Sequence, residues 1–502
     1  MTNPSGDKRK DRAAEVANTF EWLITAFVLA FVFRAFVMEA FRIPTGSMAD
    51  TLLGAHFRLR CSQCAYKYNY GLGNFNVQRD VIPQEDLRPK PSRCPSCGYL
   101  QSTGGAMRAS NGDRILVLKC IYQFFQPKQW DVVVFKNPLD PSENYIKRLI
   151  GRPGERVDII DGDIYINGQI SRKPRQVQDE LWMPVYNNDY QPARPTEPAF
   201  NRHTWQQPFR NIEGSGWVTF DANNPTVFRL DSPEDRINTL AYDTSAGNDF
   251  RATYAYDDTS DYDILPYCSD LMMRFWCRSN GGNGRVGIFL SKYETTYRAW
   301  VDFGGEMTIA RVLGGQENVL ARESISVPAG DKPVMLKFAN VDHMLIFEFG
   351  SQKISCDLKR EPNDAGPRKT DIPPQAGIFG AGKLWLSHIA LFRDIHYTDK
   401  SPHSNSFARA TEGNPLTLGQ DQFFVLGDNS PRSEDGRWWD RPGKGNYGRT
   451  YPEGIVPREY LVGKALFVYW PAGFRPFARS RFAVIPNIGQ MRLIYGGSDR
   501  IE

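Results

Sequence analysis

Hydrophobic and polar positions follow different patterns at the start of the chain and in the rest of it. Residues 20–38 are almost entirely apolar and contain only two charged positions, Glu21 and Arg34. About 20 apolar residues cross a bilayer as an α-helix. The pattern therefore predicts a transmembrane anchor at 19–40 after a polar tail at 1–18. A cleaved secretory signal is the alternative, but the apolar run is longer than a signal core and no small-x-small cleavage site follows.

Basic residues are unequally distributed on the two sides of this run. Lys8, Arg9, Lys10 and Arg12 precede it, whereas only Arg42 follows closely. Basic residues near a membrane span favour the cytoplasmic side. We expect a single-pass protein of the cytoplasmic membrane, with its N-terminus in the cytoplasm and everything after residue 40 on the outer side.

After the anchor the pattern is that of strands. Short runs rich in Val, Ile and Leu, such as "RILVLK" and "DVVVFK", are separated by Gly, Asn and Asp turns. Residues 200–397 hold many more such runs at even spacing, which is typical of a β-sandwich. The Pro-rich "QPARPTEPAF" and the polar "KSPHSNSFARATEGNP" flank them as linkers. The prediction is a mainly β protein in which one β domain is interrupted by two inserted modules.

Length and charge agree with this organisation. The 502 residues are too many for one ordinary domain, and a net charge of +4 gives no sign of a nucleic-acid partner. The predicted segments after the anchor are a first part of the β domain at 41–60, a four-cysteine module at 61–104, a second part at 105–175, a jelly-roll β-sandwich with its linkers at 176–415, and a third part at 416–502.

The four-cysteine module contains two CxxC pairs. Cys61 and Cys64 form "CSQC", and Cys94 and Cys97 form "CPSC". Two such pairs supply four thiolates from two tight turns, which is the usual ligand set of a structural, zinc-ribbon-like Zn²⁺ site. Two disulfides are the alternative, because this segment is expected outside the cytoplasm, where thiols oxidise. Free thiols are the third interpretation.

One serine and one lysine are candidates for chemistry. Ser47 lies in "PTGSM", just beyond the anchor, where a turn that ends a helix is the plain interpretation. A nucleophilic serine needs a base, and five of the six histidines lie in or beside the predicted sandwich. Lys147 lies in the apolar run "NYIKRLIG". Burial there would lower the lysine pKa and let its neutral amine act as the base, whereas a strand lysine that faces solvent would not.

Four sequence boxes carry a family resemblance. "FRIPTGSM", "GDRIL", "YIKRLIGRPGE" and "FVLGDNSPRSEDGRWW" occur in this order behind the apolar run. Together they resemble the boxes of type I signal peptidases, which are membrane-bound serine proteases with a Ser/Lys dyad. The resemblance covers residues 20–60, 110–172 and 420–470. It implies a signal-peptidase-like β catalytic domain that needs no cofactor for catalysis.

The resemblance also implies residue roles. Ser47 would be the nucleophile, Lys147 its general base, and the Thr45 hydroxyl with the Ser47 N–H the oxyanion hole. Supporting residues would be Ser433, which orients the lysine amine, the ion pair of Asp435 with Arg437, and the turn of Gly427, Asp428 and Asn429. Shallow substrate pockets would be lined by Phe41, Ile43, Met48, Leu52 and Ile146, for which core packing is the alternative.

The implied activity is the removal of signal peptides from exported preproteins, with cleavage after small residues in an A-x-A-like pattern. The expected partners are these preproteins, the lipid bilayer and the secretory translocon. The sandwich resembles concanavalin-like or laminin-G-like jelly rolls, for which a carbohydrate or protein ligand is expected; "YETTYRAW" and "WVDF" offer aromatic candidates. The rival hypotheses are a non-catalytic membrane protein that displays a lectin-like sandwich, and a self-cleaving Ser/Lys regulator, which the anchor argues against.

Overall fold

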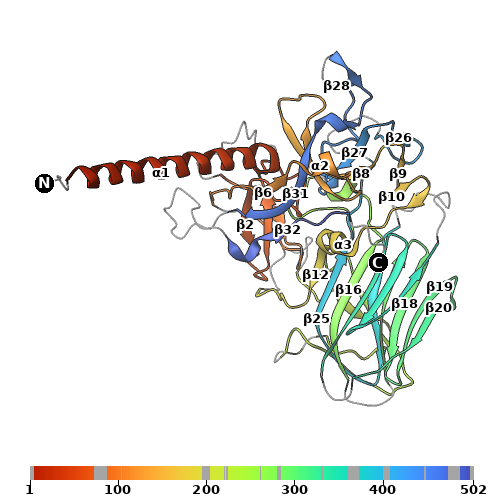
Figure 1. Cartoon of the computed structure of the whole chain (residues 1–502). Helices are drawn as coiled ribbons and strands as arrows, with labels where there is room; N and C mark the ends of the chain where they lie inside the picture. Colours follow the sequence, from red (N-terminus) through yellow and green to blue (C-terminus); the bar gives the residue numbers. More distant parts are fainter. Residues whose placement is uncertain are drawn as a thin grey trace.

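A computed structural model describes residues 5–72, 87–102, 105–194, 204–219, 221, 224–260, 262–279, 284–328, 332–359, 372–399, 408–445, 448–472 and 487–497. Strands dominate these residues, and the expectation of a mainly β protein with an N-terminal apolar helix is confirmed (Figure 1). The predicted linkers lie partly outside the described residues.

The N-terminal helix projects from the β-rich body of the molecule (Figure 1). It comprises α1 (Ser5–Val32) and a π-helical turn at Phe33–Val37. The segment Glu15–Val37 is long and apolar enough to cross a membrane. Its large apolar side chains face outward, as a lipid-facing helix requires. The helix ends before residue 40, where we had expected the anchor to end, because Met38 already begins strand β1.

One large sheet collects strands from every predicted part of the β domain. It orders β1-β6-β31-β7-β8-β27-β30, with β32 paired to β31, and a smaller sheet orders β11-β10-β9-β26. The bounds in the large sheet are β1 (Met38–Arg42), β6 (Arg114–Leu118), β31 (Leu461–Trp470), β7 (Val132–Lys136), β8 (Asn144–Gly151), β27 (Gln422–Leu426), β30 (Val456–Pro457) and β32 (Arg492–Leu493). Those in the smaller sheet are β9 (Arg156–Ile160), β10 (Asp163–Ile166), β11 (Gln169–Ile170) and β26 (Leu416–Thr417).

Three short elements border these sheets: α2 (Ile121–Phe124) and the hairpin of β28 (Gly443–Lys444) with β29 (Thr450–Tyr451). The aromatic run "CIYQFFQPKQW" contains α2 and, on sequence grounds, would be packed in the core more readily than placed at a membrane. Trp130 and Tyr122 do pack against the core, but Phe124 at the end of α2 is 74% exposed and Phe125 is 64% exposed. Their rings therefore leave an apolar spot on the surface of the β domain.

The predicted sandwich is present as two antiparallel sheets packed over one apolar core. Side chains alternate between this core and the surface along strands such as β15 and β22. One sheet contains β12 (Met183–Asn187), β14 (Phe228–Asp231), β16 (Leu271–Ser279), β21 (Val334–Val341), β22 (Met344–Phe349), β23 (Gln352–Asp357) and β25 (Lys383–Arg393). The other contains β13 (Phe209–Asn211), β15 (Asn238–Tyr242), β17 (Arg285–Lys292), β18 (Thr295–Asp302), β19 (Glu306–Leu313), β20 (Gln316–Ser324) and β24 (Ala376–Ala381).

Two details of the sandwich differ from the sequence expectation. Strand β12 lies well before residue 200, where the core of the sandwich was expected to begin, and it directly follows α3 (Arg175–Leu181). Two of the aromatic candidates for sugar stacking are buried, since Tyr297 is 8% and Trp300 only 5% exposed, whereas Tyr293 is partly exposed. Tyr297 and Trp300 therefore do not offer free ring faces, and a carbohydrate ligand stays a prediction of the sequence.

Buried ion pairs fix the sandwich to the smaller sheet. The ammonium of Lys292 on β17 contacts the carboxylates of Asp163 on β10 and Asp270 beside β16. Lys173, which follows β11, likewise contacts Asp342 and lies 2.8 Å from Asp394. Buried charges are tolerated when they are paired, and removal of one partner is strongly destabilising. The inserted sandwich and the β domain are thus joined by a polar, desolvated interface.

Candidate active site

The loop that carries Ser47 is held on both flanks by the "GDRIL" box. The Leu53 N–H donates to the Asp113 carboxylate at 3.1 Å, and the Ile43 N–H donates to the Asp113 carbonyl at 2.8 Å. A Cβ at Gly112 would overlap the Ile43 carbonyl, so only glycine allows this approach. Asp113 is fully buried. These contacts fix the position of the Ser47 loop relative to β6.

Lys147 lies on β8, in the centre of the large sheet, and its side chain is only 4% exposed. Its ammonium nitrogen donates a hydrogen bond to Ser47 Oγ at 2.6 Å. The fold thus brings together two residues that are 100 positions apart in the sequence. A nucleophile and a base within hydrogen-bond reach are the geometric requirement for an activated serine.

Burial lowers the pKa of Lys147 to about 8, because desolvation disfavours the charged ammonium. The carboxylates of Asp435, Glu434 and Asp428 oppose this effect and raise the pKa in part. Asp428 and Asp435 are each paired with an arginine, which reduces their influence. Within the described residues Lys147 forms no ion pair of its own, so its amine loses a proton far more readily than a surface lysine.

The Asp428 carboxylate is held by Arg148, the residue after Lys147. Arg148 Nε donates to Asp428 Oδ1 at 2.8 Å and Nη2 donates to Oδ2 at 2.7 Å, and neither side chain has exposed area. The sequence interpretation assigned Asp428 to the turn and missed Arg148 as its partner. A signal was available, because two successive cations in an apolar strand point to opposite faces and a buried one must be paired.

The predicted ion pair of Asp435 and Arg437 has bidentate geometry, with distances of 2.9 and 2.8 Å between completely buried side chains. Asp435 Oδ2 also accepts the Gly427 N–H at 2.9 Å. In the same turn the Asn429 N–H donates to the Ser47 carbonyl at 3.1 Å. This turn therefore bonds directly to the backbone of the candidate nucleophile.

Two of the predicted hydroxyl groups have different surroundings. Thr45 is exposed beside the partly exposed Ser47 and is accessible to a substrate carbonyl. Ser433 is buried, and its Oγ has no hydrogen-bond partner in the described part of the chain. The structure therefore does not contain the hydrogen bond from Lys147 to Ser433 that the resemblance implied. A Cβ at Gly427 would overlap the Ser433 hydroxyl and the Ser47 carbonyl, so glycine lets these groups meet.

The five candidate lining residues belong to one apolar cluster that includes side chains of β6, β7 and β31. Ile43, Met48 and Leu52 are fully buried and act as core side chains in this structure. Phe41 and Ile146 are only partly buried at the edge of the cluster. These two side chains are the ones that a substrate can reach without rearrangement of the core.

The four cysteines of the inserted module lie on two turns of matching geometry. The Cys61 N–H donates to Tyr66 O and its carbonyl accepts from the Ala65 N–H; Cys94 forms the same pair with Tyr99 and Gly98. Ala65 and Gly98 both have positive φ. The turns are flanked by the strand pair β2 (His56–Arg60) with β3 (Lys67–Gly71) and the pair β4 (Ser92–Arg93) with β5 (Leu100–Gln101).

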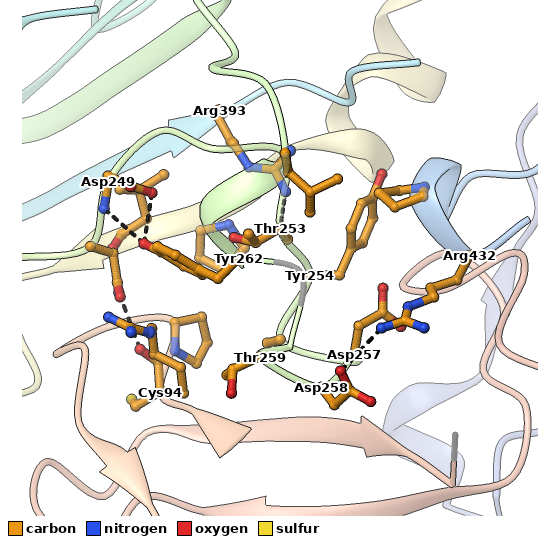
Figure 2. A pocket seen from close by; sticks show the side chains of 18 residues that line it. Cys94, Asp249, Thr253, Tyr254, Asp257, Asp258, Thr259, Tyr262, Arg393 and Arg432 are labelled. Atoms are coloured by element: carbon orange, nitrogen blue, oxygen red, sulfur yellow. Dashed lines mark hydrogen bonds and ion pairs between the residues drawn. The ribbon is translucent and has the colours of Figure 1, made fainter. Parts of the chain in front are cut away.

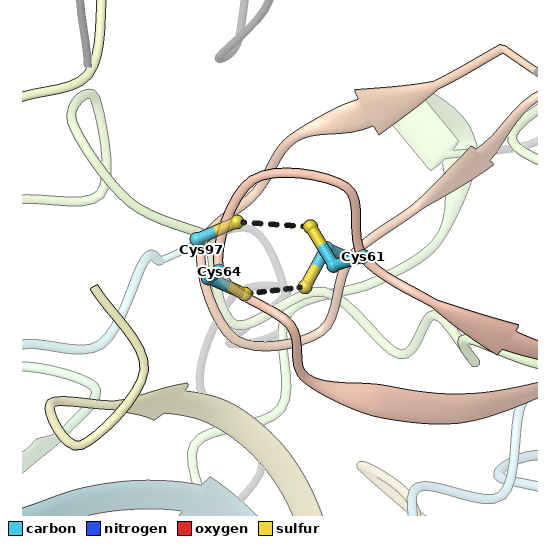
Figure 3. Close-up of side chains that lie close together, drawn as sticks. Cys61, Cys64 and Cys97 are labelled. Atoms are coloured by element: carbon cyan, nitrogen blue, oxygen red, sulfur yellow. Dashed lines mark hydrogen bonds between the residues drawn. The ribbon is translucent and has the colours of Figure 1, made fainter. Parts of the chain in front are cut away.

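The four sulfur atoms converge at one buried point (Figure 3). Cys61 Sγ lies 3.7 Å from Cys97 Sγ, Cys64 Sγ lies 3.6 Å from Cys94 Sγ, and all four sulfurs are within 4.8 Å of one another. A disulfide needs about 2.05 Å. A tetrahedron with metal–sulfur bonds of about 2.3 Å has sulfur–sulfur edges of about 3.8 Å. The arrangement therefore has the dimensions of a tetrahedral four-thiolate metal site.

Two solved structures show a weak likeness to this chain. The carbohydrate binding module CBM66 from Bacillus subtilis is 11% identical, covers 37% of this chain and 96% of its own, and has a TM-score of 0.25. Sheep galectin-11 is 10% identical, covers 25% of this chain and 92% of its own, and has a TM-score of 0.19. Likenesses at these TM-scores do not establish a common fold.

A sequence family does match the β domain. The family described as "Signal peptidase, peptidase S26" matches residues 99–207 and 382–470, which include Lys147 and the 427–437 turn but not Ser47. Signal peptidase I of Rickettsia canadensis is 33% identical over 150 residues, and that of Rickettsia akari 32% over 150 residues. Each match covers 29% of this chain and 42% of the relative, so the chain spans under half the length of these relatives. Residues 99–207 and 382–470 are thus similar to the peptidase S26 family, and the relatives that match the chain are type I signal peptidases.

Proposed function

We propose that this chain is a membrane-anchored serine endopeptidase that removes N-terminal signal peptides from exported preproteins. The observation that carries the proposal is the 2.6 Å hydrogen bond between Ser47 and the buried Lys147, which lies in the segment that matches the peptidase S26 family. A non-catalytic binding protein would have no need to keep a desolvated lysine beside a partly exposed serine. The match to signal peptidase I supports the substrate class.

The proposed mechanism uses Lys147 as the only proton carrier. The neutral amine takes the Ser47 Oγ proton while Oγ attacks the scissile carbonyl carbon, and the ammonium then protonates the departing amine. Lys147 next takes a proton from a water that attacks the acyl carbonyl carbon, and it returns this proton to Ser47 Oγ as the bond between Oγ and the acyl carbon breaks. The Ser47 N–H and the Thr45 hydroxyl would stabilise the oxyanion, where loss of one donor costs about 2.7–4 kcal/mol.

The substrate would bind as an added strand. Strand β8 pairs with β7 from Asn144 to Arg148, but β27 pairs with β8 only from Arg148 onward. The edge of residues 144–146 that faces away from β7 has no partner among the described strands, and it lies beside Lys147. An extended peptide can add to such an edge through main-chain hydrogen bonds. Phe41 and Ile146 would then contact its small side chains.

The anchor would hold this site near the bilayer, where a signal peptide emerges. The basic residues before α1 favour a cytoplasmic N-terminus and a catalytic domain on the outer side of the cytoplasmic membrane. The exposed pair Phe124 and Phe125 offers a second apolar contact with lipid. The translocon and a carbohydrate or protein ligand of the sandwich stay predictions of the sequence.

Cleavage of a preprotein tests the proposal directly. We expect the detergent-solubilised full chain to cut a preprotein with an A-x-A site after the second alanine, as read by mass spectrometry of both products. A substrate with a bulky residue at that position should be cut at least about tenfold more slowly, because shallow pockets reject it. Ser47→Ala serves as the inactive control. An intact preprotein after incubation with folded wild type would contradict the proposed function.

We further propose that Cys61, Cys64, Cys94 and Cys97 bind one structural Zn²⁺. Four buried sulfurs at tetrahedral spacing fit this ion, and thiolates are ligands it prefers. The ion would tie the two turns of the module into one unit and would take no part in the peptidase reaction.

Metal analysis should find about one zinc ion per chain, since one four-thiolate site holds one ion. Cys94→Ser should remove it and lower the melting temperature. The matched control is Cys277→Ala, which alters a buried cysteine of the sandwich core and should leave the zinc content unchanged. Mass spectrometry that shows two disulfides in the unreduced protein would refute the metal site.

A further inference from the structure

We propose that residues 253–258 of the inserted sandwich position the catalytic turn and the nucleophile loop, so that the insertion is part of the active-site scaffold. This inference rests on the proposed function. The segment follows β15 in the chain and contacts residues 427–432, here called the catalytic turn, and residues 46–55, here called the nucleophile loop. Its residues are positioning residues, because they act through these segments and not on the substrate.

Tyr254 bonds to the catalytic turn itself. Its hydroxyl donates to the Asp428 carbonyl at 2.7 Å, and both groups are buried. The next residue, Asn429, donates its N–H to the Ser47 carbonyl. The peptide unit between Asp428 and Asn429 is therefore bonded to the insertion through its carbonyl and to the Ser47 carbonyl through its N–H.

Asn429 has a second bond to the insertion. Its side-chain amide donates to Asp257 Oδ1 at 3.0 Å, where Asp257 is the third residue after Tyr254. Arg432 of the turn also forms an ion pair with Asp258 of the insertion, and its Nη2 lies 3.1 Å from Asp258 Oδ1. Figure 2 shows Arg432 facing Asp258, with Asp257 beside them, in a pocket that is lined by residues of both segments. Each of the three contacts joins the insertion to the same short turn.

Tyr256 contacts the nucleophile loop. A Cβ at Gly46, the residue before Ser47, would overlap the Tyr256 ring, and so would a Cβ at Gly71. The Tyr256 hydroxyl also donates to the Ala55 carbonyl at 3.0 Å. The ring is therefore held between strand β3 of the cysteine module and the loop of the nucleophile, and Gly46 is required for its close packing.

The positioning segment is itself fixed within the insertion. The Arg393 guanidinium at the end of β25 donates to the Thr253 carbonyl, as Figure 2 shows. Arg251 Nη1 donates to the Leu265 carbonyl at 2.7 Å. A segment anchored in this way transmits the rigidity of the sandwich to the catalytic turn. Packing against rigid elements is what holds catalytic groups in productive geometry.

The test compares two tyrosines that make the same kind of bond. Tyr254→Phe removes a buried hydroxyl bond to the catalytic turn. Tyr242→Phe removes a buried hydroxyl bond to the Asn248 carbonyl, 2.9 Å long, inside the sandwich. Both are introduced into the full-length protein, and kcat, KM and melting temperature are measured with the A-x-A preprotein. Amide hydrogen exchange of the peptide that contains 427–429 is followed in parallel.

We expect similar small losses of melting temperature in both variants, but only Tyr254→Phe should lower kcat, by about 2- to 10-fold with little change in KM. Combination with Asp257→Ala should enlarge the loss, whereas Asp257→Asn keeps an acceptor for Asn429 and should restore most of it. Amide hydrogen exchange at 427–429 should be faster than in the wild type for Tyr254→Phe but not for Tyr242→Phe.

The outcomes separate this inference from the proposed function. A wild type that cannot cleave contradicts the proposed function, and the exchange data then decide the inference without any activity. Unchanged exchange in Tyr254→Phe, or equal losses of kcat in the two tyrosine variants, would show that the segment is ordinary domain packing and would overturn the inference.

Discussion

Lys147→Met is expected to leave a folded protein that has lost about 10³-fold or more of its kcat/KM toward the A-x-A preprotein. A positioned general base contributes about 10²- to 10⁴-fold. Lys147 would act as both base and acid in two successive steps, so the expected loss lies in the upper half of this range. Methionine has a similar length and no charge, and it suits the apolar strand in which Lys147 is buried. The loss should therefore appear in catalysis and not in the melting temperature.

The dependence of the wild-type kcat/KM on pH is a second test of Lys147 as the general base. An ammonium cannot accept the Ser47 proton, so kcat/KM should rise about tenfold per pH unit on the acidic side and level off above the lysine pKa of about 8. Lys147→Arg retains a cation that cannot deprotonate and should be inactive over the whole range. A midpoint near pH 6, or an active Lys147→Met, would assign the base to another group.

The candidate dyad could be predicted from the sequence through the resemblance of four boxes to type I signal peptidases. The local patterns alone left a plain turn open for Ser47, which follows the helix-breaking Pro44 and Gly46, and a solvent-facing position open for Lys147. Local patterns did predict the mainly β fold and the paired cysteine turns. None of these predictions depended on contacts between segments that are distant in the sequence.

Contacts between distant segments could not be predicted. The partner of Arg148 is Asp428, which is 280 positions away, and the bond from Tyr254 to Asp428 spans 174 positions. Tyr254 and Tyr256 lie in an acidic, aromatic stretch that has no local feature to link it to Ser47. The early start of the sandwich at β12 was missed for the same reason, since a short strand is recognised only through its pairing with β25.

Arg148→Met is expected to lower the free energy of unfolding by about 3–5 kcal/mol, because it leaves the Asp428 carboxylate buried without its partner. The control is Arg156→Met on β9, whose side chain is 57% exposed and lies 3.8 Å from Asp158. That exposed pair contributes about 0–1 kcal/mol. Denaturant unfolding measures both variants. Equal effects would mean that the buried pair is not the stabilising element its geometry indicates.

Arg148→Met should also move the acidic limb of the pH profile of kcat/KM to higher pH. The Asp428 carboxylate raises the pKa of Lys147, and the Arg148 guanidinium offsets its charge in the wild type. An ionised Asp428 without its partner favours the ammonium form of Lys147 more strongly, so the lysine pKa rises and the limb shifts to higher pH.

The double variant Arg148→Met/Asp428→Leu removes both charges and should bring the limb back toward or below the wild-type position. A limb that stays at the wild-type pH in Arg148→Met, with the protein folded, would show that Asp428 has no electrostatic influence on the base. Stability and the Lys147 pKa are linked here through Asp428, because its carboxylate is one of three that raise this pKa and its pairing with Arg148 offsets the effect.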